Sequence, residues 1–195
     1  MKIGVLALQG AFIEHVQKLK HLGVDAVEVR LPKDLEGCDG VIIPGGESTT
    51  IGKLAVHYQL MEPLRQMAYD GKAVWGTCAG LIFMAKDVGR DQPLLGLMDV
   101  QVERNAFGRQ VDSFEADLIV KDINGSTPFH AIFIRAPLIE AVGDGVKVLA
   151  KAEKDNREVI VAAQQDNLLV TSFHPELSND DRFHRYFLSI ARHQS

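Results

Sequence analysis

The strongest constraint on the fold is the alternation of apolar, strand-like runs with helical spacings in the first half of the chain. Residues 3–8 (IGVLAL) form an uninterrupted apolar run, which predicts a strand buried on both faces. Residues 12–22 follow with apolar side chains at helical spacing, and Gly23 stands where such a helix would end. Further strands are predicted at 26–30, 40–43 and 73–76 and helices at 60–69 and 81–86. Strands joined through helices pair in parallel, so we expect a doubly wound sheet.

The second half contains short β-rich runs with little helix between them, which predicts antiparallel strands or an extension at the sheet edge. These runs are 98–103, 116–121, 130–134, 146–151, 158–163 and 168–173. A final helix is predicted at 180–193, with Asn179 as its N-cap. The chain has 195 residues and no Pro-, Gly- or Ser-rich linker. We therefore expect residues 1–195 to form one α/β domain, with a mostly parallel central sheet and antiparallel additions in the second half.

Composition narrows the class of function. Lys and Arg number 21 against 26 Asp and Glu, giving a net charge of −5. This acidic balance argues against a protein that binds the phosphate backbone of nucleic acids. Two cysteines, Cys38 and Cys78, do not make a disulfide framework, and no apolar segment is long enough for a signal peptide core or a membrane helix. We expect a soluble, cytoplasmic protein that binds neither nucleic acid nor membrane.

The strongest local motif is Gly-Thr-Cys-Ala-Gly at 76–80, between a predicted strand and a predicted helix. This is the context of a nucleophile elbow, with Cys78 in the nucleophile's place. Small residues on both sides let the turn close tightly, and the positive end of the following helix favours the thiolate. A small buried cysteine in a tight turn is the alternative interpretation.

A second motif, His174-Pro175-Glu176, follows the predicted strand 168–173. Pro175 favours an extended His174, so that the side chains of residues 174 and 176 project to the same side. A carboxylate in that position could orient the imidazole and stabilise its charged form. Taken alone, the motif also fits a histidine in a proline-containing turn beside a solvated glutamate.

A third motif, Pro-Gly-Gly-Glu-Ser at 44–48, follows the predicted strand 40–43. Its backbone N–H groups could supply an oxyanion hole for acyl transfer. A phosphate-binding P-loop is excluded because no lysine follows at the required spacing. A simple turn at the end of a strand is the alternative for two glycines alone.

The three motifs are most informative together, because each follows a strand and the ends of parallel strands meet at one sheet edge. A nucleophile, a base with its orienting group and oxyanion donors are the components of acyl-transfer chemistry. Arg104 and Arg135 also end strand-like runs and could clamp a carboxylate. His15 is expected near the loop after the first strand, and His184 shows no ligand spacing. No His or Cys pattern indicates a metal site.

The motifs at 76–80, 44–48 and 174–176 resemble those of the class I glutamine amidotransferases. Five longer segments narrow the resemblance to the family of glutaminase subunits of pyridoxal 5′-phosphate synthases. They are LALQGAFIEH at 6–15, PGGESTT at 44–50, VERNAFGRQVDSFEADL at 102–118, FIRAP at 133–137 and SFHPEL at 172–177. The segment 102–118 is the specific one, since other amidotransferases share only the triad motifs.

The resemblance implies a flavodoxin-like three-layer sandwich that hydrolyses L-glutamine to glutamate and ammonia. The ammonia would pass to a separate (β/α)₈-barrel synthase subunit within a hetero-oligomer. That subunit makes pyridoxal 5′-phosphate, which is a product, so the chain would need no cofactor and no metal.

Residue by residue, the resemblance implies Cys78 as nucleophile, His174 as base and Glu176 as its orienter. Gly46 and Ala79 would donate N–H groups to the oxyanion, and Gln9 would lie near the synthase contact and take part in activation. Glutamine would be contacted by Gly46, Glu47, Ser48, Arg104, Ile134 and Arg135. Ile51-Gly52-Lys53 departs from the family's usual Met-Arg-Arg, which could alter contacts beside the site.

Three other functions stay open at this point. A cysteine peptidase or amidase on a related fold would keep the elbow but would have no reason to carry a glutamine pocket. A non-catalytic regulatory subunit would be expected to lack the nucleophile or the base, yet all three triad residues are present. A glutaminase subunit of another synthase is disfavoured only by the segments 102–118 and 133–137.

Overall fold

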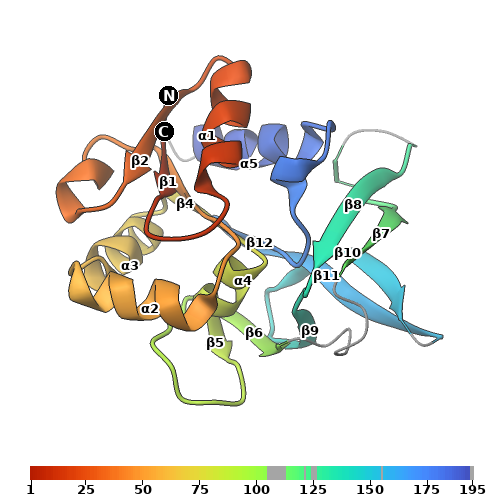
Figure 1. Ribbon diagram of the computed structural model, residues 1–195. Helices are drawn as coiled ribbons and strands as arrows, with labels where there is room; N and C mark the ends of the chain where they lie inside the picture. The colour runs from red at the N-terminus through yellow and green to blue at the C-terminus, as the bar shows by residue number, and fades with distance from the viewer. Residues whose placement is uncertain (105–112, 121, 124–126, 155, 194–195) are drawn as a thin grey trace.

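The computed structural model in Figure 1 describes residues 1–104, 113–120, 122–123, 127–154 and 156–193. The α-helices are α1 (Phe12–His21), α2 (Ser48–His57), α3 (Met61–Tyr69), α4 (Ala79–Met84) and α5 (Arg182–His193), with 3₁₀ turns η1 (Pro32–Leu35) and η2 (Pro175–Leu177). The strands are β1 (Lys2–Leu6), β2 (Asp25–Val29), β3 (Gly40–Ile43), β4 (Ala73–Thr77), β5 (Ala85–Asp87), β6 (Met98–Glu103), β7 (Ser113–Leu118), β8 (Phe129–Ile134), β9 (Leu138–Val142), β10 (Lys147–Lys154), β11 (Arg157–Gln165) and β12 (Leu168–Thr171).

One half of the main sheet is parallel and carries the order β2-β1-β3-β4-β12. The β1-to-β4 part of this order comes from strands that alternate with helices along the chain, as the sequence predicts. β12 returns from the far end of the chain and pairs in parallel with β4, so that Thr171 lies opposite Thr77. The doubly wound, mostly parallel core predicted from the sequence is thereby confirmed.

The second half of the chain extends the sheet through β11, β9 and β6, which pair antiparallel. At the edge, β5 from the first half of the chain pairs in parallel with β6. β10 pairs antiparallel with β11, and β7 and β8 form a separate two-stranded antiparallel sheet. The predicted antiparallel additions are therefore confirmed. β5 and β9 are strands that the sequence analysis did not predict.

Helices cover both faces of the parallel half and make the three-layer sandwich visible in Figure 1. On one face, Ile42, Trp75 and Leu169 pack in a cluster with side chains of α1 and α5. On the other, Val41 and Val74 belong to a cluster with α2, α3 and α4. The strands are apolar on both sides because both of their faces are covered, which explains the continuous apolar runs in the sequence.

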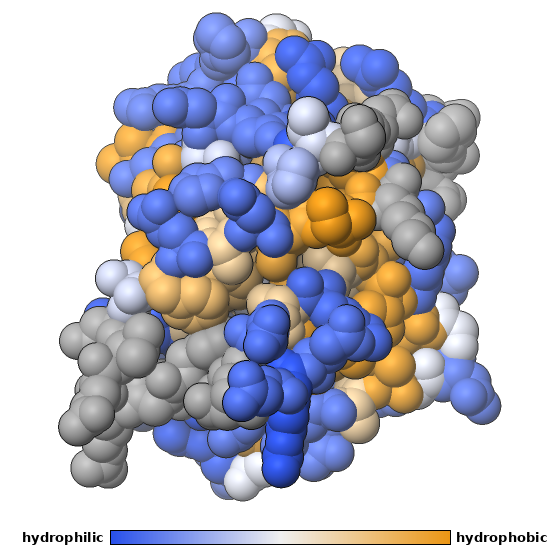
Figure 2. Space-filling view, turned by 90° about the vertical axis from the view of Figure 1, so that its right-hand side faces the viewer, coloured by the Kyte–Doolittle hydropathy of each residue, from blue (hydrophilic) through white to orange (hydrophobic). Residues whose placement is uncertain are grey.

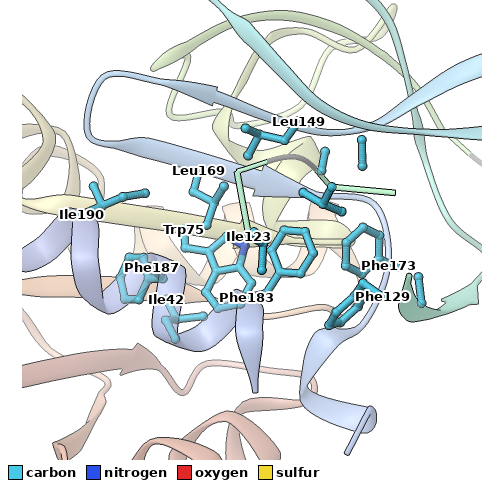
Figure 3. Close-up of a cluster of buried hydrophobic side chains, with 14 of the residues drawn as sticks. Ile42, Trp75, Ile123, Phe129, Leu149, Leu169, Phe173, Phe183, Phe187 and Ile190 are labelled. Carbon is cyan, nitrogen blue, oxygen red and sulfur yellow. The ribbon is translucent and has the colours of Figure 1, made fainter. Parts of the chain in front are cut away.

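Aromatic rings fill the core between the main sheet, α5 and the β7–β8 sheet (Figure 3). The Phe183 ring lies 4.8 Å from the Phe129 ring and 5.0 Å from the Phe173 ring, both edge-on. It also stacks at 6.5 Å on Trp75 from β4. Phe183 therefore links the terminal helix to the centre of the sheet and to the loop that carries His174.

Helix ends follow the sequence in one case and differ in another. The α1 helix ends in a Schellman motif: Gly23 has φ +76°, its N–H donates to Lys20 O, and Val24 N–H donates to Leu19 O. Gly23 thus has the predicted terminating role. At the start of α5 the prediction of Asn179 as cap is wrong, because Asp180 Oδ1 accepts the Arg182 N–H at 2.9 Å.

Several boundaries differ from the sequence predictions. α2 is a helix that the sequence analysis does not predict, since Thr49, Thr50 and Gly52 are weak helix formers. The predicted helix 81–86 starts two residues earlier and stops at Met84, because β5 begins at Ala85. The predicted strand 116–121 lies at Ser113–Leu118, and its last residue falls outside the described residues.

The surface mixes polar and apolar residues. On the face shown in Figure 2, hydrophilic side chains surround a band of hydrophobic ones. Among the described helices, none combines the length and apolar character needed to cross a membrane.

Phe183→Ala should lower the free energy of unfolding by about 3–5 kcal/mol, because a fully buried ring is replaced by a cavity. Urea unfolding followed by circular dichroism measures this change. Tyr69→Ala is the control: Tyr69 is 72% exposed, so its removal should change stability by no more than about 0.5 kcal/mol. Equal effects of the two substitutions would contradict the packing described above.

Candidate active site

Three loops that carry the sequence motifs leave the sheet at the same level. Ile43 at the end of β3 pairs with Gly76 of β4, and Thr77 of β4 pairs with Thr171 at the end of β12. Because these strands are parallel, the residues that follow them come together at one edge. The Gly-Gly loop, Cys78 and His174 are thus neighbours although they lie far apart in the sequence.

A cavity of about 460 Å³ opens at this edge. It is lined by Gln9, Gly46, Glu47, Ser48, Cys78, Ala79, Ile82, Arg104, Ile134, Arg135 and His174. Every residue that the sequence analysis assigned to the site lines this cavity, except Glu176. Glu176 lies behind His174, in contact with its far ring nitrogen.

Cys78 sits on a strained turn between β4 and α4. Its backbone has φ +48° and ψ −104°, a conformation that residues with a side chain rarely adopt. The turn closes because its flanking residues are small: a Cβ on Gly80 would lie 2.0 Å from the Ile43 carbonyl oxygen. The Cys78 N–H donates to Thr171 O at 2.8 Å and fastens the elbow to β12.

His174 and Glu176 are joined by a hydrogen bond of 2.7 Å between Nδ1 and Oε1. Burial alone lowers the pKa of His174, but its interactions with Cys78 and Glu176 outweigh burial and raise that pKa to about 10. Burial likewise raises the pKa of Glu176, but the neighbouring His15 and His174 hold it well below its usual value. The arrangement therefore favours an ionised carboxylate beside a charged imidazole.

The Gly-Gly loop is held against the turn after β1. Gly45 O accepts the Ala11 N–H at 3.0 Å, and Gln9 Oε1 accepts the Glu47 N–H at 2.7 Å. Since the two ends of a trans peptide point in opposite directions, the Gly46 N–H faces away from Ala11. Gly45 must lack a side chain, because a Cβ there would lie 2.4 Å from the His174 ring.

A charged cluster forms one wall of the cavity. Glu47 caps α2, accepting the N–H groups of Thr49 and Thr50 at 3.0 and 2.7 Å. Partial burial raises the pKa of Glu47, but a hydrogen bond from the Thr50 hydroxyl, together with these two backbone bonds, outweighs burial and lowers the pKa to about 2. Arg104 lies 3.3 Å from Glu47 Oε1 and donates to Gln92 Oε1 at 2.7 Å. The wall thus presents one carboxylate and one guanidinium at fixed positions.

The opposite wall comes from the end of β8. The Ile134 carbonyl oxygen lies 3.8 Å from Cys78 Sγ, so the chain passes directly beside the thiol. Arg135 follows with φ +43°, an unusual conformation for a residue with a side chain. Among the described residues, no group of three or more His, Cys, Asp or Glu side chains is arranged to hold a metal ion.

A family model described as "SNO glutamine amidotransferase family" matches residues 5–192. The chain belongs to this glutamine amidotransferase family. It is 56% identical over 193 residues to the "Pyridoxal 5′-phosphate synthase subunit PdxT" of Desulforamulus reducens, covering 98% of this chain and 100% of that protein. It is also 56% identical over 191 residues to the protein of the same name from Moorella thermoacetica, covering 97% and 99%.

Solved structures agree with the family. One described as "Crystal structure of glutamine amidotransferase" superposes with a TM-score of 0.90 at 50% identity, covering 97% of this chain and 98% of that one. PurLQS from Thermotoga maritima superposes with a TM-score of 0.74 at 18% identity and supports the fold alone. The amidotransferase fold expected from the resemblance is therefore confirmed.

Three residues around the site were missed or misjudged from the sequence. Ile82 lines the cavity, and Gln92 binds Arg104 from the loop between β5 and β6; neither belongs to a motif. The expectation that His15 lies near the loop after β1 is wrong for its side chain, which is fully buried 3.3 Å from Glu176. The helical spacing of His15 from the buried Leu19, four residues later, is a signal in the sequence that could have shown this burial. Part of the segment 102–118, residues 105–112, lies outside the described residues.

Cys78 should react with iodoacetamide faster than Cys38 does. Cys78 lines the cavity next to His174, whereas Cys38 is buried under η1, where desolvation raises its thiol pKa. Mass spectrometry of tryptic peptides after timed alkylation of the native protein measures both rates. Denatured protein, in which the two thiols should react alike, is the control; faster labelling of Cys38 in the native state would contradict this geometry.

Proposed function

We propose that this chain is the glutaminase subunit of a pyridoxal 5′-phosphate synthase and hydrolyses L-glutamine to glutamate and ammonia. The observation that carries the proposal is that Cys78 and His174 line the cavity, with Glu176 bonded to His174 from behind, in a member of a glutamine amidotransferase family. The names of its relatives at 56% identity support the choice of synthase. Residues 1–195 would then form one amidotransferase domain.

In the proposed reaction, the Cys78 thiolate attacks the side-chain amide carbon of glutamine. The electron pair of the C=O bond moves to oxygen, where the N–H groups of Gly46 and Ala79 stabilise the oxyanion. The His174 imidazolium donates its proton to the leaving nitrogen, and ammonia departs as the thioester forms. His174 then removes a proton from water, which attacks the thioester, releases the thiolate and yields glutamate.

Glu176 accepts the Nδ1–H of His174 and thereby directs Nε2 of the same ring toward the thiol. Its negative charge stabilises the imidazolium that each proton transfer requires. No metal or redox group takes part in this scheme, because thiol, imidazole and backbone N–H groups supply every step.

The charges of the cavity suit an α-amino acid, which carries one ammonium and one carboxylate group. The Glu47 carboxylate can accept the ammonium, and the Arg104 and Arg135 guanidinium groups can bind the carboxylate. Ser48 and the Ile134 backbone complete the proposed glutamine contacts. A peptidase or general amidase would have no need for this pairing, so release of glutamate from free glutamine without cleavage of peptides separates the two functions.

The proposed partner is a (β/α)₈-barrel synthase subunit that receives the ammonia in a hetero-oligomer. The proposed subcellular location is the cytoplasm, since Cys38 and Cys78 are both free thiols. The decisive experiment is a glutaminase assay of the chain with and without this synthase subunit. Absence of glutamate release in both cases would refute the proposed function.

Cys78→Ala should abolish glutamine hydrolysis while leaving the fold intact, because the nucleophile is lost and a smaller side chain fits the same turn. Glutamate release in the presence of the synthase subunit measures activity, and circular dichroism checks the fold. Cys38→Ser is the matched control and should keep nearly full activity, since Cys38 lies away from the cavity. Unchanged turnover in Cys78→Ala would remove this thiol from the mechanism.

The synthase subunit should activate the chain, and Gln9→Ala should reduce that activation more than it reduces glutamine binding. Gln9 Oε1 holds the Glu47 N–H, next to the Gly45–Gly46 peptide whose N–H the oxyanion needs. An oxyanion donor contributes roughly 10²–10³ in rate at comparable sites, so reorienting one peptide could act as a switch.

Glutaminase turnover with and without excess synthase subunit measures the activation, and isothermal titration calorimetry measures glutamine binding. Gln101→Ala, an exposed substitution on β6, is the control. Full activity of the isolated chain, or unaltered activation of Gln9→Ala, would refute this hypothesis.

A further inference from the structure

Behind the proposed triad lies a group of buried polar side chains that the reaction scheme does not use. His15 of α1 and His184 of α5 are both fully buried, and Glu176 is 6% exposed. Two buried imidazoles side by side are costly unless their nitrogen atoms find partners. Their hydrogen bonds therefore indicate what these histidines do.

The nitrogen and oxygen atoms of this group form a continuous chain. His184 Nε2 lies 3.0 Å from His15 Nδ1. His15 Nε2 lies 3.3 Å from Glu176 Oε2 and 3.4 Å from the Thr77 hydroxyl. Glu176 Oε1 is bonded to His174 Nδ1 at 2.7 Å. Apart from the long contact with His15, no hydrogen-bond partner of Glu176 Oε2 is present among the described residues.

The positions of the protons follow from His184 Nδ1, the ring nitrogen at the end of this hydrogen-bonded series. His184 Nδ1 is buried and has no hydrogen-bond partner in the part of the chain that the structure describes. A buried N–H without an acceptor is rare in folded proteins, whereas an unpaired acceptor is better tolerated. His184 therefore carries its proton on Nε2 and donates it to His15 Nδ1.

The remaining protons are then determined. Because His15 Nδ1 accepts, the neutral His15 ring carries its proton on Nε2, where it faces both the Glu176 carboxylate and the Thr77 hydroxyl. The reverse direction, or a doubly protonated His15, would make His184 Nε2 an acceptor and would leave a buried N–H on Nδ1. Burial lowers the pKa of His184 well below its ordinary value, which is consistent with a neutral His184 ring at the end of this hydrogen-bonded series.

We propose that His15 is a positioning residue for the glutaminase reaction, because a directed chain from His184 through His15 to Glu176 holds the carboxylate against His174. This inference rests on the proposed function and extends it to two residues outside the triad. The Glu176 carboxylate then accepts the His174 N–H on Oε1, while the His15 N–H faces Oε2 at an Nε2–Oε2 distance of 3.3 Å. Neither His15 nor His184 lines the cavity, so neither is expected to touch glutamine.

The wild-type protein provides the first test. Nitrogen-15 NMR of its histidine rings at pH 7 should show His15 and His184 as neutral rings protonated on Nε2, with Nδ1 unprotonated in both. A proton on His184 Nδ1 would show that the hydrogen bonds are not donated in the direction of Glu176 and would overturn the inference. This measurement needs no variant and no activity.

Two variants of nearly equal size and shape provide the second test. His15→Met removes the donor, whereas His15→Gln keeps an amide N–H that can reach Glu176. Loss of one hydrogen bond to a charged group predicts that His15→Met lowers kcat about tenfold or more, with KM little changed. His15→Gln should recover most of that loss. Assays use the chain with its synthase subunit, and melting temperatures of both variants report on folding.

A purely structural role predicts a different result. The two variants would then lose activity equally, or would lose it only in proportion to unfolded protein, and either result would overturn the inference. Wild-type kcat in His15→Met would also overturn it. If the wild-type protein and Cys78→Ala both fail to release glutamate, the proposed function itself fails. The NMR test still decides the direction of the hydrogen bonds from His184 through His15 to Glu176.

Discussion

The site depends on the parallel pairing of β4 with β3 on one side and β12 on the other. This register places the ends of three strands side by side and thereby brings together loops that start at residues 44, 78 and 172. β12 is the last strand in the chain, and its pairing with β4 places His174 and Glu176 beside Cys78. The site therefore depends on a pairing between residues far apart in the sequence, such as Val74 with Leu168.

A second dependence is electrostatic. The Glu176 carboxylate is nearly buried, and a buried charge without partners is strongly unfavourable. His174 and His15 approach its two oxygens from opposite sides, and α1 and η2 are packed together so that this contact can form. Helix α1 also follows the loop whose Gln9 and Ala11 bind the Gly-Gly loop. The segment formed by this loop and α1 thus touches both the orienting carboxylate and the proposed oxyanion loop.

Local sequence features predict most of the fold and most of the residues that line the site. Apolar runs predicted the core strands because both faces of the parallel sheet are covered, and the small residues around Cys78 predicted the elbow because no larger residue fits beside Ile43. The contacts that were missed are long-range. The bond from Arg104 to Gln92 involves a glutamine that belongs to no motif, and the contact of His15 with Glu176 joins residues that are distant in the sequence. Helix α2 was missed because it is stabilised by the Glu47 cap and by packing, whereas the helix propensity of its residues is weak.

The strained backbone of Cys78 has a consequence for the stability of the protein. A residue with a side chain in such a conformation costs on the order of 1–3 kcal/mol, and glycine would relieve that cost. The cysteine at this position therefore makes the fold less stable than it could be. Directed evolution for heat resistance without a screen for turnover would tend to replace the one thiol that faces the cavity, so the rest of the structure must tolerate a weak point at its reactive centre.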